Sequence, residues 1–480
     1  MTVKTIIDTV SILRNALDNG QGVKYKRLAQ ALESAIAAGT LVAGGKLPPQ
    51  RNLADELGVT VGTISRAYAE LERLGLVVAR VGDGTFVRQR GLERQRDNGF
   101  RNVSEAPQAH YDMSRNMHIP GQETALLAQS LRALADDPQR LRTLALYGPE
   151  PGHPRHRQAG AQWLSHEDFI ADAEQVLCVN GAQHGLLTTL SALFRPGDTL
   201  VTEHLTYPGL IAAARLLGLK LLGIEMDEEG LLPDSLDELC RINRVAALYC
   251  TPTLQNPTTA VLSSERRQVI AQLCRRHNLL ILEDEAHAVL LERRPPPLSR
   301  FAPERSILIG SLSKAVAAGL RVGYLHAPKE LLGRLSAALR TSCWMATPLT
   351  QELASQWIED GTAVTLLRQQ IAEIERRKRL VGGLLGGLNY RSQPQSPHFW
   401  IEVPEPWRAS AIEAELQHKH YLVSSAEAFA VGRTAVPQFI RASVSNTADD
   451  DQRLYDGFLT LASSLHQGDQ HFAPGGPERP

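Results

Sequence analysis

The stretch from residue 176 to residue 309 alternates short apolar segments with longer segments of helical pattern. Six of the short segments have the length and composition of buried strands: 176–179, 200–202, 221–224, 245–249, 279–283 and 306–309. Strands that alternate with helices form a parallel sheet whose faces are covered by those helices. The sequence therefore predicts an α/β domain with a large parallel sheet, whose ligand site lies where the strands end.

At 480 residues, the chain is longer than one hydrophobic core supports, so more than one domain is expected. A helical region around 362–385 leads into a smaller α+β segment at 388–467, which we assign to the same large domain. The predicted organisation is an N-terminal extension (1–22), a small domain (23–90), a polar linker (91–110), the large domain (111–467) and a flexible tail (468–480).

The small domain shows three helical patterns followed by two strand-like runs. Leu28, Leu32 and Ile36 form one apolar stripe, the second helix is predicted at 50–57, and the third at 61–74 after the turn Gly58-Val59. The strand-like runs, 76–80 and 85–88, flank an Asp-Gly pair that is typical of a hairpin. This order predicts a helix-turn-helix with a β-hairpin wing.

Several classes of protein are disfavoured. The chain has no apolar stretch long enough to cross a bilayer, and its N-terminus lacks the layout of a secretion signal, so we expect a cytoplasmic protein that does not bind membranes. The five cysteines are scattered and never form a CxxC pair, which argues against disulfides and a metal site. We expect them to be reduced core residues: Cys178, Cys240, Cys250, Cys274 and Cys343.

Charge is unevenly distributed. Residues 21–90 hold ten Lys and Arg against six Asp and Glu, whereas the rest of the chain is slightly acidic. Such a basic head is typical of DNA binding. We expect Thr60 to cap the third helix, base edges to be read from its first turns, and basic residues before it and in the wing to contact phosphates. The candidate DNA-binding residues are Lys46, Arg51, Thr60, Thr63, Ser65, Arg66 and Arg80.

Any one of these arginines is equally well explained as a solvated surface charge, but the ordered set is more specific. The segment KLPPQRNLADELGVTVGTISRAYAELERLGLVVARVGDGTFV resembles the winged helix-turn-helix of GntR-type regulators. Pro49 stands where that family usually has Ser, and Val61-Gly62 stand where many relatives have Arg and a polar residue. Sequence readout should therefore rest more on Thr63 and Arg66.

The large domain contains the groups that pyridoxal phosphate requires: a lysine, an acid for the pyridine nitrogen, a donor to the ring oxygen, a stacking ring and an anion cradle. Lys314 lies in SLSK, with Ser311, Ser313 and Arg321 nearby to hold phosphate. Asp284 ends an apolar run, and Asn256 follows another in QNPT. Taken singly, SLSK is a chance match, Asn-Pro a turn and Asp284 a strand-end cap; their common order and placement favour a cofactor site.

Further candidates surround this set. Gly181, Ala182 and Gln183 follow a strand and open a helix, whose N-terminus favours a phosphate group. Tyr207, in TYPG, could stack on the pyridine ring. Tyr147, in YGPEPG, lies before the large sheet begins.

From Asp112 to Leu465 the chain resembles fold-type-I aminotransferases through YGPEPG, NGAQHGL, TYPG, QNPT, DEAH, SLSK, GLRVGY and IRASVS. The resemblance implies that Lys314 is the Schiff-base lysine, Asp284 binds the pyridine nitrogen, Asn256 the ring oxygen, and Tyr207 stacks. It implies phosphate contacts for Gly181, Ala182, Gln183, Ser311, Ser313 and Arg321, with Tyr147 reaching the phosphate of the other subunit in a homodimer. Arg441 in FIRASVS corresponds to the arginine that binds a substrate carboxylate.

One departure concerns His287. Aminotransferases usually have Asp-x-x-Tyr, and this chain has Asp284-Glu285-Ala286-His287. His287 either donates a hydrogen bond to the cofactor in place of the tyrosine or is a packed histidine that points elsewhere.

The two parts together resemble the MocR-like subfamily of GntR-type regulators. The resemblance implies a homodimer that binds pyridoxal phosphate and operator DNA, and whose DNA binding responds to an amino compound or to the cofactor itself. The alternative is a working aminotransferase with an appended DNA-binding domain. A purely structural dimerisation domain is disfavoured by the intact set of cofactor residues.

Overall fold

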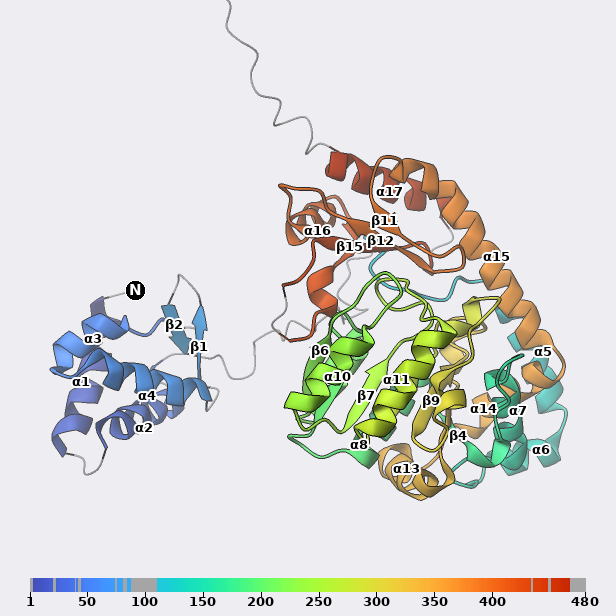
Figure 1. Cartoon of the computed structure of the whole chain (residues 1–480), viewed down its shortest axis with the longest axis horizontal. Helices are drawn as coiled ribbons and strands as arrows, with labels where there is room; N and C mark the ends of the chain where they lie inside the picture. The colour runs from blue at the N-terminus through green and yellow to red at the C-terminus, as the bar shows by residue number, and fades with distance from the viewer. Residues whose placement is uncertain are drawn as a thin grey trace, which may run out of the picture. The chain divides into compact units, whose positions relative to one another are not determined.

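The computed structural model describes residues 3–19, 23–38, 40–41, 45–73, 76–80, 84–87, 110–432, 435–447 and 450–466. They belong to two compact units, one within Met1–Asp97 and one within Asn98–Pro480 (Figure 1). The predicted linker up to residue 109 and the predicted tail lie outside the described residues. The described residues include no helix that is long and apolar enough to cross a membrane.

The first unit packs four helices and a hairpin around one small core. The helices are α1 (Val3–Asn19), α2 (Lys24–Ala37), α3 (Gln50–Leu57) and α4 (Val61–Arg73), and the antiparallel hairpin is β1 (Val77–Arg80) with β2 (Gly84–Val87). The predicted bounds of α3 agree with the structure. Gly58, at φ 62°, ends α3 in the left-handed conformation that glycine adopts without strain.

Helix α1 was not predicted, because residues 1–22 were expected to be only an extension. Val10, Leu13 and Leu17 recur at spacings of three and four, the period of one helix face. Leu13 is fully buried in the same cluster as Leu28 and Leu53. The N-terminal helix is therefore part of the core of this unit.

The second unit is built on a seven-stranded sheet with the order β4-β10-β9-β8-β7-β5-β6. Its strands are β4 (Val176–Val179), β5 (Thr199–Glu203), β6 (Lys220–Ile224), β7 (Ala247–Cys250), β8 (Leu280–Asp284), β9 (Ser306–Ser311) and β10 (Gly323–His326). The predicted parallel pairing holds for β5, β6, β7, β8 and β9, whereas β10 pairs antiparallel with both β4 and β9, so the sheet is mixed. The six predicted strands are all present; β10 was missed because GLRVGY was interpreted only as part of a phosphate site.

Helices cover both faces of this sheet (Figure 1). The helices of the large sheet and its N-terminal flank are α5 (Glu123–Ala135), α6 (Pro138–Leu144), α7 (Pro154–Leu164), α8 (Ala182–Leu193), α9 (Pro208–Leu216), α10 (Pro233–Ile242), α11 (Ser264–Arg276), α12 (Leu298–Phe301), α13 (Lys329–Cys343) and α14 (Pro348–Glu359). Apolar side chains from strands and helices form continuous clusters, such as Leu177, Leu186 and Leu335, all fully buried. Cys178, Cys250 and Cys274 are buried as expected, whereas Cys343 is exposed and Cys240 half-buried, so those two are not core residues.

The remaining segment forms a smaller α+β layer. Helix α15 (Thr362–Gly382) leads to a four-stranded sheet of β11 (Tyr390–Arg391), β12 (His398–Glu402), β15 (Phe439–Ser443) and β14 (Ser424–Ser425), with α16 (Ala409–His418) and α17 (Asp451–His466). The first strand of the unit, β3 (Tyr111–Asp112), pairs in parallel with β13 (Tyr421–Leu422). Segment 111–119, which we call the strap, therefore begins on this smaller layer.

Candidate functional site

A cavity of about 400 Å³ lies where the strands of the large sheet end. Arg441, predicted to bind a carboxylate, lines it together with most of the predicted cofactor residues: Ala182, Gln183, Tyr207, Asn256, Asp284, His287, Ser311, Ser313, Lys314 and Arg321. Residues more than 250 positions apart in the chain thus meet in one site. Asp284 and Ser311 end strands β8 and β9, Ala182 begins α8, and Arg441 lies within β15, so the fold brings side chains from both sheets to one place.

Lys314 and Asp284 supply the opposite charges of the cavity. The Nζ atom of Lys314 donates a hydrogen bond of 2.5 Å to the backbone oxygen of Asn116. Burial, helped by the nearby positive charges of Arg441 and Arg321, lowers the pKa of Lys314 to about 8. A fraction of this lysine is therefore a neutral amine near neutral pH, which is the nucleophilic form.

Asp284, at the end of β8, is a buried carboxyl whose pKa is raised by burial. Two donors oppose that effect: the hydroxyl of Tyr249 donates to Oδ2 at 2.8 Å, and the backbone N–H of Ala286 donates to Oδ1 at 3.0 Å. Hydrogen bonds to the charged form favour ionisation. The carboxyl is therefore held in place for a cationic partner in the cavity.

A cradle for an anion forms between the start of α8 and the loop after β9. Gly181 precedes α8 at φ 84°, and a side-chain carbon there would lie 2.6 Å from Nη2 of Arg321. Only glycine allows the guanidinium of Arg321 to approach the N-terminus of α8 this closely. Arg321 also donates to the hydroxyl of Ser313 at 3.3 Å, and Ser311 donates to Ser313 at 2.9 Å. Backbone and side-chain donors thus converge on one point.

Arg441 forms a second positive site within the same cavity. It is buried, donates from Nη1 to Oδ1 of Asn256 at 2.6 Å, and hydrogen-bonds from Nη2 to the backbone oxygen of Ser114. Its Nε atom has no hydrogen-bond partner among the described residues. Burial lowers the pKa of Arg441 to about 10, and the guanidinium still remains cationic near neutral pH. A buried arginine with an unused donor is suited to binding a carboxylate.

The residues of the strap were not predicted from the sequence. Arg115, Asn116 and Met117 line the cavity, as does Thr251 after β7. No pattern marked the strap, because it is neither periodic nor at the end of a long strand. Tyr147 does not line the cavity; its side chain is 80% exposed and its ring centroid lies 5.3 Å from that of Trp344.

Four of the candidate DNA-binding residues lie on α4 or directly before it: Thr60, Thr63, Ser65 and Arg66. The backbone N–H of Thr63 donates to Oγ1 of Thr60 at 3.3 Å, which confirms Thr60 as the cap of α4. Arg51, Ser65 and Arg66 are exposed, Thr63 is half-buried, and the amine of Lys46 lies 5.4 Å from the ring centroid of Phe86. Arg80 ends β1, but its side chain lies outside the described residues.

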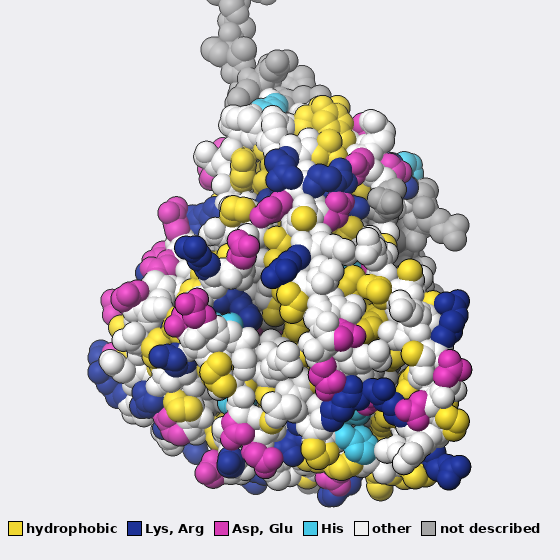
Figure 2. All heavy atoms as spheres, turned by 90° about the vertical axis from the view of Figure 1, so that its right-hand side faces the viewer, with side chains coloured by type: hydrophobic (Ala, Val, Ile, Leu, Met, Phe, Trp, Pro, Cys, Tyr) yellow, Lys and Arg dark blue, Asp and Glu magenta, His cyan; other side chains and the backbone are white. Residues whose placement is uncertain are grey.

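The second unit offers a contrast on the face that Figure 2 shows. Basic and acidic side chains are interspersed there, with separate hydrophobic positions between them. DNA binding requires basic residues gathered on one surface. The described residues on this visible face show no such gathering.

Comparisons with known proteins agree with both units. Residues 113–458 match the family "aminotransferase class I and II", and residues 24–87 match "bacterial regulatory proteins, gntR family". The HTH-type transcriptional regulator YdeF of Bacillus subtilis is 30% identical over 429 residues, which cover 89% of this chain and 92% of that protein. The vitamin B6 salvage pathway transcriptional repressor PtsJ of Salmonella typhimurium is 25% identical over 460 residues, covering 93% of this chain and 98% of PtsJ.

Solved structures show the same fold for the second unit. An archaeal alanine:glyoxylate aminotransferase has a TM-score of 0.68 at 21% identity, over 75% of this chain and 91% of its own. The α-aminoadipate aminotransferase LysN of Thermus thermophilus, solved with N-(5'-phosphopyridoxyl)-L-leucine, has a TM-score of 0.67 at 23% identity, over 77% and 95%.

The fold and the comparisons define a transcriptional regulator in which a helix-turn-helix head precedes a domain with the aminotransferase fold. The chain belongs to the aminotransferase class I and II family and, with its gntR-family head, to the MocR-like regulators within the GntR family.

Proposed function

We propose that the cavity binds pyridoxal phosphate on Lys314 and an amino compound beside it, and that its occupancy sets the affinity of the head for operator DNA. The cofactor supplies an electrophilic carbon and an electron-withdrawing ring. The donor set fits it: an amine with a lowered pKa, a buried carboxyl and two separate anion sites. Operator binding also implies that the chain works in the cytoplasm.

Each residue has a defined part in this proposal. Lys314 would hold the cofactor through its neutral amine, Asp284 would pair with the pyridine nitrogen, and Tyr207 would stack on the ring. Asn256 donates to the ring oxygen and His287 lies beside it. The phosphate is bound by Gly181, Ala182, Gln183, Ser311, Ser313 and Arg321, and Arg441 binds the carboxylate of the effector.

The observation that carries the regulatory part is the hydrogen bonding of the strap. Lys314 and Arg441 donate to the backbone oxygens of Asn116 and Ser114, and these residues follow the linker from the DNA-binding head. A cofactor on Lys314 or a carboxylate on Arg441 competes for the same donors. Ligands shift an equilibrium only through such differential interactions. Occupancy of the cavity therefore changes what holds the strap.

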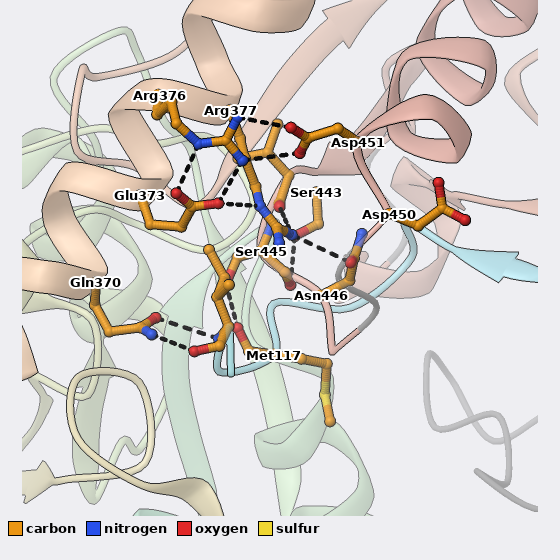
Figure 3. A network of polar contacts seen from close by, with 12 residues as sticks. Met117, Gln370, Glu373, Arg376, Arg377, Ser443, Ser445, Asn446, Asp450 and Asp451 are labelled. Carbon is orange, nitrogen blue, oxygen red and sulfur yellow. Dashed lines mark hydrogen bonds and ion pairs between the residues drawn. The ribbon is translucent and has the colours of Figure 1, made fainter. Parts of the chain in front are cut away.

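On its other side, the strap is held by the smaller layer. The backbone N–H of Met117 donates to the oxygen of Ser445 at 2.7 Å, and the hydroxyl of Ser445 donates back to the oxygen of Met117 (Figure 3). The side chain of Gln370 on α15 binds both the N–H and the oxygen of Ile119. The strap thus connects the ligand-binding side chains with α15 and with the loop after β15.

The proposal includes a homodimer. Leu146 is 62% exposed and Trp344 is 51% exposed, beside the still more exposed Tyr147. Large apolar side chains that cluster at a surface are typical of an interface. A second copy that covers them would allow Tyr147 to reach the phosphate of its partner.

Transamination is the second candidate activity, and the match to the aminotransferase family supports it. Transamination would require the same two residues, Lys314 for the cofactor and Arg441 for the carboxylate of the substrate. Incubation of the loaded chain with an amino acid and a 2-oxo acid, followed by product analysis, separates turnover from sensing.

Absorption spectroscopy of Lys314→Ala tests the cofactor assignment. The wild-type chain loaded with pyridoxal phosphate should show the visible band of the lysine-bound cofactor, and Lys314→Ala should lack it. Lys329→Ala, which removes an exposed lysine elsewhere in the unit, should retain it. A band that persists unchanged in Lys314→Ala contradicts the proposal.

A further inference from the structure

Asn116 occupies a position that the proposed function does not explain. Its side chain is 7% exposed, lines the cavity, and comes from the strap rather than from the large sheet. The Nδ2 atom lies 2.9 Å from Nδ1 of His398 and 3.4 Å from Nε2 of His287. One amide nitrogen therefore faces two imidazoles.

The hydrogen bond between His398 and Pro257 determines where the protons of Asn116, His398 and His287 lie. Nε2 of His398 lies 2.8 Å from the backbone oxygen of Pro257, which can only accept, so Nε2 carries a proton. Burial lowers the pKa of His398 well below its usual value, so the ring is neutral and has no second proton. Its Nδ1 must then accept, and Asn116 must present its NH₂ group. The reversed amide would place an acceptor against an acceptor.

The second hydrogen of that NH₂ group determines the state of His287. Burial, with Lys314 and Arg441 nearby, lowers the pKa of His287 to about 3, so its ring is also neutral. Since Nε2 accepts from Asn116, the single proton lies on Nδ1. His287 lines the cavity, and its Nδ1–H is left to serve a ligand.

We infer that Asn116 and His398 are positioning residues that hold His287 as its Nδ1–H tautomer, so that His287 is a neutral hydrogen-bond donor to the ring oxygen of pyridoxal phosphate. The inference rests on the proposed cofactor site and identifies what replaces the usual tyrosine. A donor to the ring oxygen favours the negative oxygen and so lowers the pH at which the bound cofactor loses its proton.

The test uses the full chain loaded with pyridoxal phosphate and follows its visible absorption against pH. Asn116→Leu keeps the size of the side chain and the backbone oxygen that binds Lys314, but removes both donors. This variant should raise the pH at the midpoint of the absorption change by about one pH unit. His287→Phe should raise it at least as much. The double variant should match His287→Phe, because Asn116 acts only through His287.

Lys329→Ala, which removes an exposed lysine that does not line the cavity, is the control. Its midpoint should not move. The other charged or titratable groups around the cavity are unchanged in every variant, so their effect is common to all: Arg115, Tyr207, Asp284, Lys314, Arg321, His398 and Arg441. An unmoved midpoint in Asn116→Leu, or a shift that persists in full on the His287→Phe background, overturns the inference.

Nitrogen-15 NMR spectra of the chain with labelled histidines test the tautomer of His287 without the cofactor. With His287→Phe to assign the signal, the spectrum of His287 should show a protonated Nδ1 and an unprotonated Nε2. The reverse assignment overturns the tautomer. A wild-type chain that develops no visible band contradicts the proposed function instead, and the spectra still decide the tautomer.

Discussion

At the scale of single residues, the cavity places ionisable groups where burial and hydrogen bonds oppose each other. Burial lowers the pKa of Lys314, whereas the pKa of Asp284 is raised by burial and held down by its donors. Tyr249 is the side-chain donor to Asp284 and is itself fully buried. The hydroxyl of Tyr324 is also buried but has no hydrogen-bond partner among the described residues.

These two tyrosines form a matched pair. Tyr249→Phe removes a hydrogen bond to a buried carboxyl, so it should lower the free energy of unfolding by about 1–3 kcal/mol and weaken the binding of pyridoxal phosphate. Tyr324→Phe removes a hydroxyl without a partner and should change stability by less than about 0.5 kcal/mol. Urea unfolding and cofactor titration check both variants. Equal losses for the two would show that Tyr249 has no special part in holding Asp284.

Residues at strand ends were predictable from the sequence, and those of the strap were not. Lys314, Asp284 and Asn256 each follow an apolar run, and the parallel part of the sheet brings such positions to one edge. Asn116 has no such signal. Its partners His287 and His398 lie 171 and 282 residues further along the chain, a proximity that only the folded chain creates.

At the scale of elements, periodicity identified helices α2, α3 and α4 of the head and six strands of the large sheet. It did not identify β10, whose residues GLRVGY were interpreted as part of a phosphate site, and it could not give the antiparallel direction of β10, which is set by pairing with β4 and β9. Helix α1 was also not predicted, although its sequence carries the apolar period of a helix in Val10, Leu13 and Leu17. Element type was therefore largely predictable, and sheet direction was not.

Helix α15 offers a test of how the strap is supported. Arg376 and Arg377 are neighbours on α15 and both bind Glu373 (Figure 3). The side chain of Arg377 is 1% exposed and also donates to the oxygen of Val444, whereas that of Arg376 is 44% exposed and pairs with Asp451.

Arg377→Ala should cost about 3–5 kcal/mol of unfolding free energy, because it leaves buried partners without their donor. Arg376→Ala removes an exposed ion pair and should cost about 0–1 kcal/mol. Thermal or urea unfolding checks the difference. Similar costs for both variants would mean that the buried network does not hold α15 against the loop after β15.

We expect helix α3 to contact the DNA backbone and helix α4 to contact the bases. Arg51→Ala, on α3, should weaken binding to all sequences, because a phosphate contact carries no sequence information. Arg66→Ala, on α4, should reduce discrimination between specific and random DNA by about 1–3 kcal/mol. Fluorescence anisotropy with both kinds of DNA separates these outcomes, and parallel losses for the two variants would contradict the division.

At the scale of the whole molecule, the chain joins a DNA-binding unit to a ligand-binding unit through the segment that leads into the strap. The comparisons identify the families of the two units, and we propose that a ligand in the cavity alters how the strap is held. Lys314 and Arg441 donate to backbone oxygens of the strap, and the proposed ligands would use the same two side chains. The coupling therefore requires a cavity that can be loaded.

The most direct test measures the affinity of the full chain for a DNA fragment selected from a randomised pool, by fluorescence anisotropy. Wild type and Lys314→Ala are each measured without cofactor, with pyridoxal phosphate, and with pyridoxal phosphate plus each member of a panel of amino acids. We expect at least one ligand state to change the Kd of the wild type by about fivefold or more, and Lys314→Ala to show no dependence on the cofactor. An identical Kd in every ligand state of a wild-type chain whose absorption band confirms loading would contradict the account.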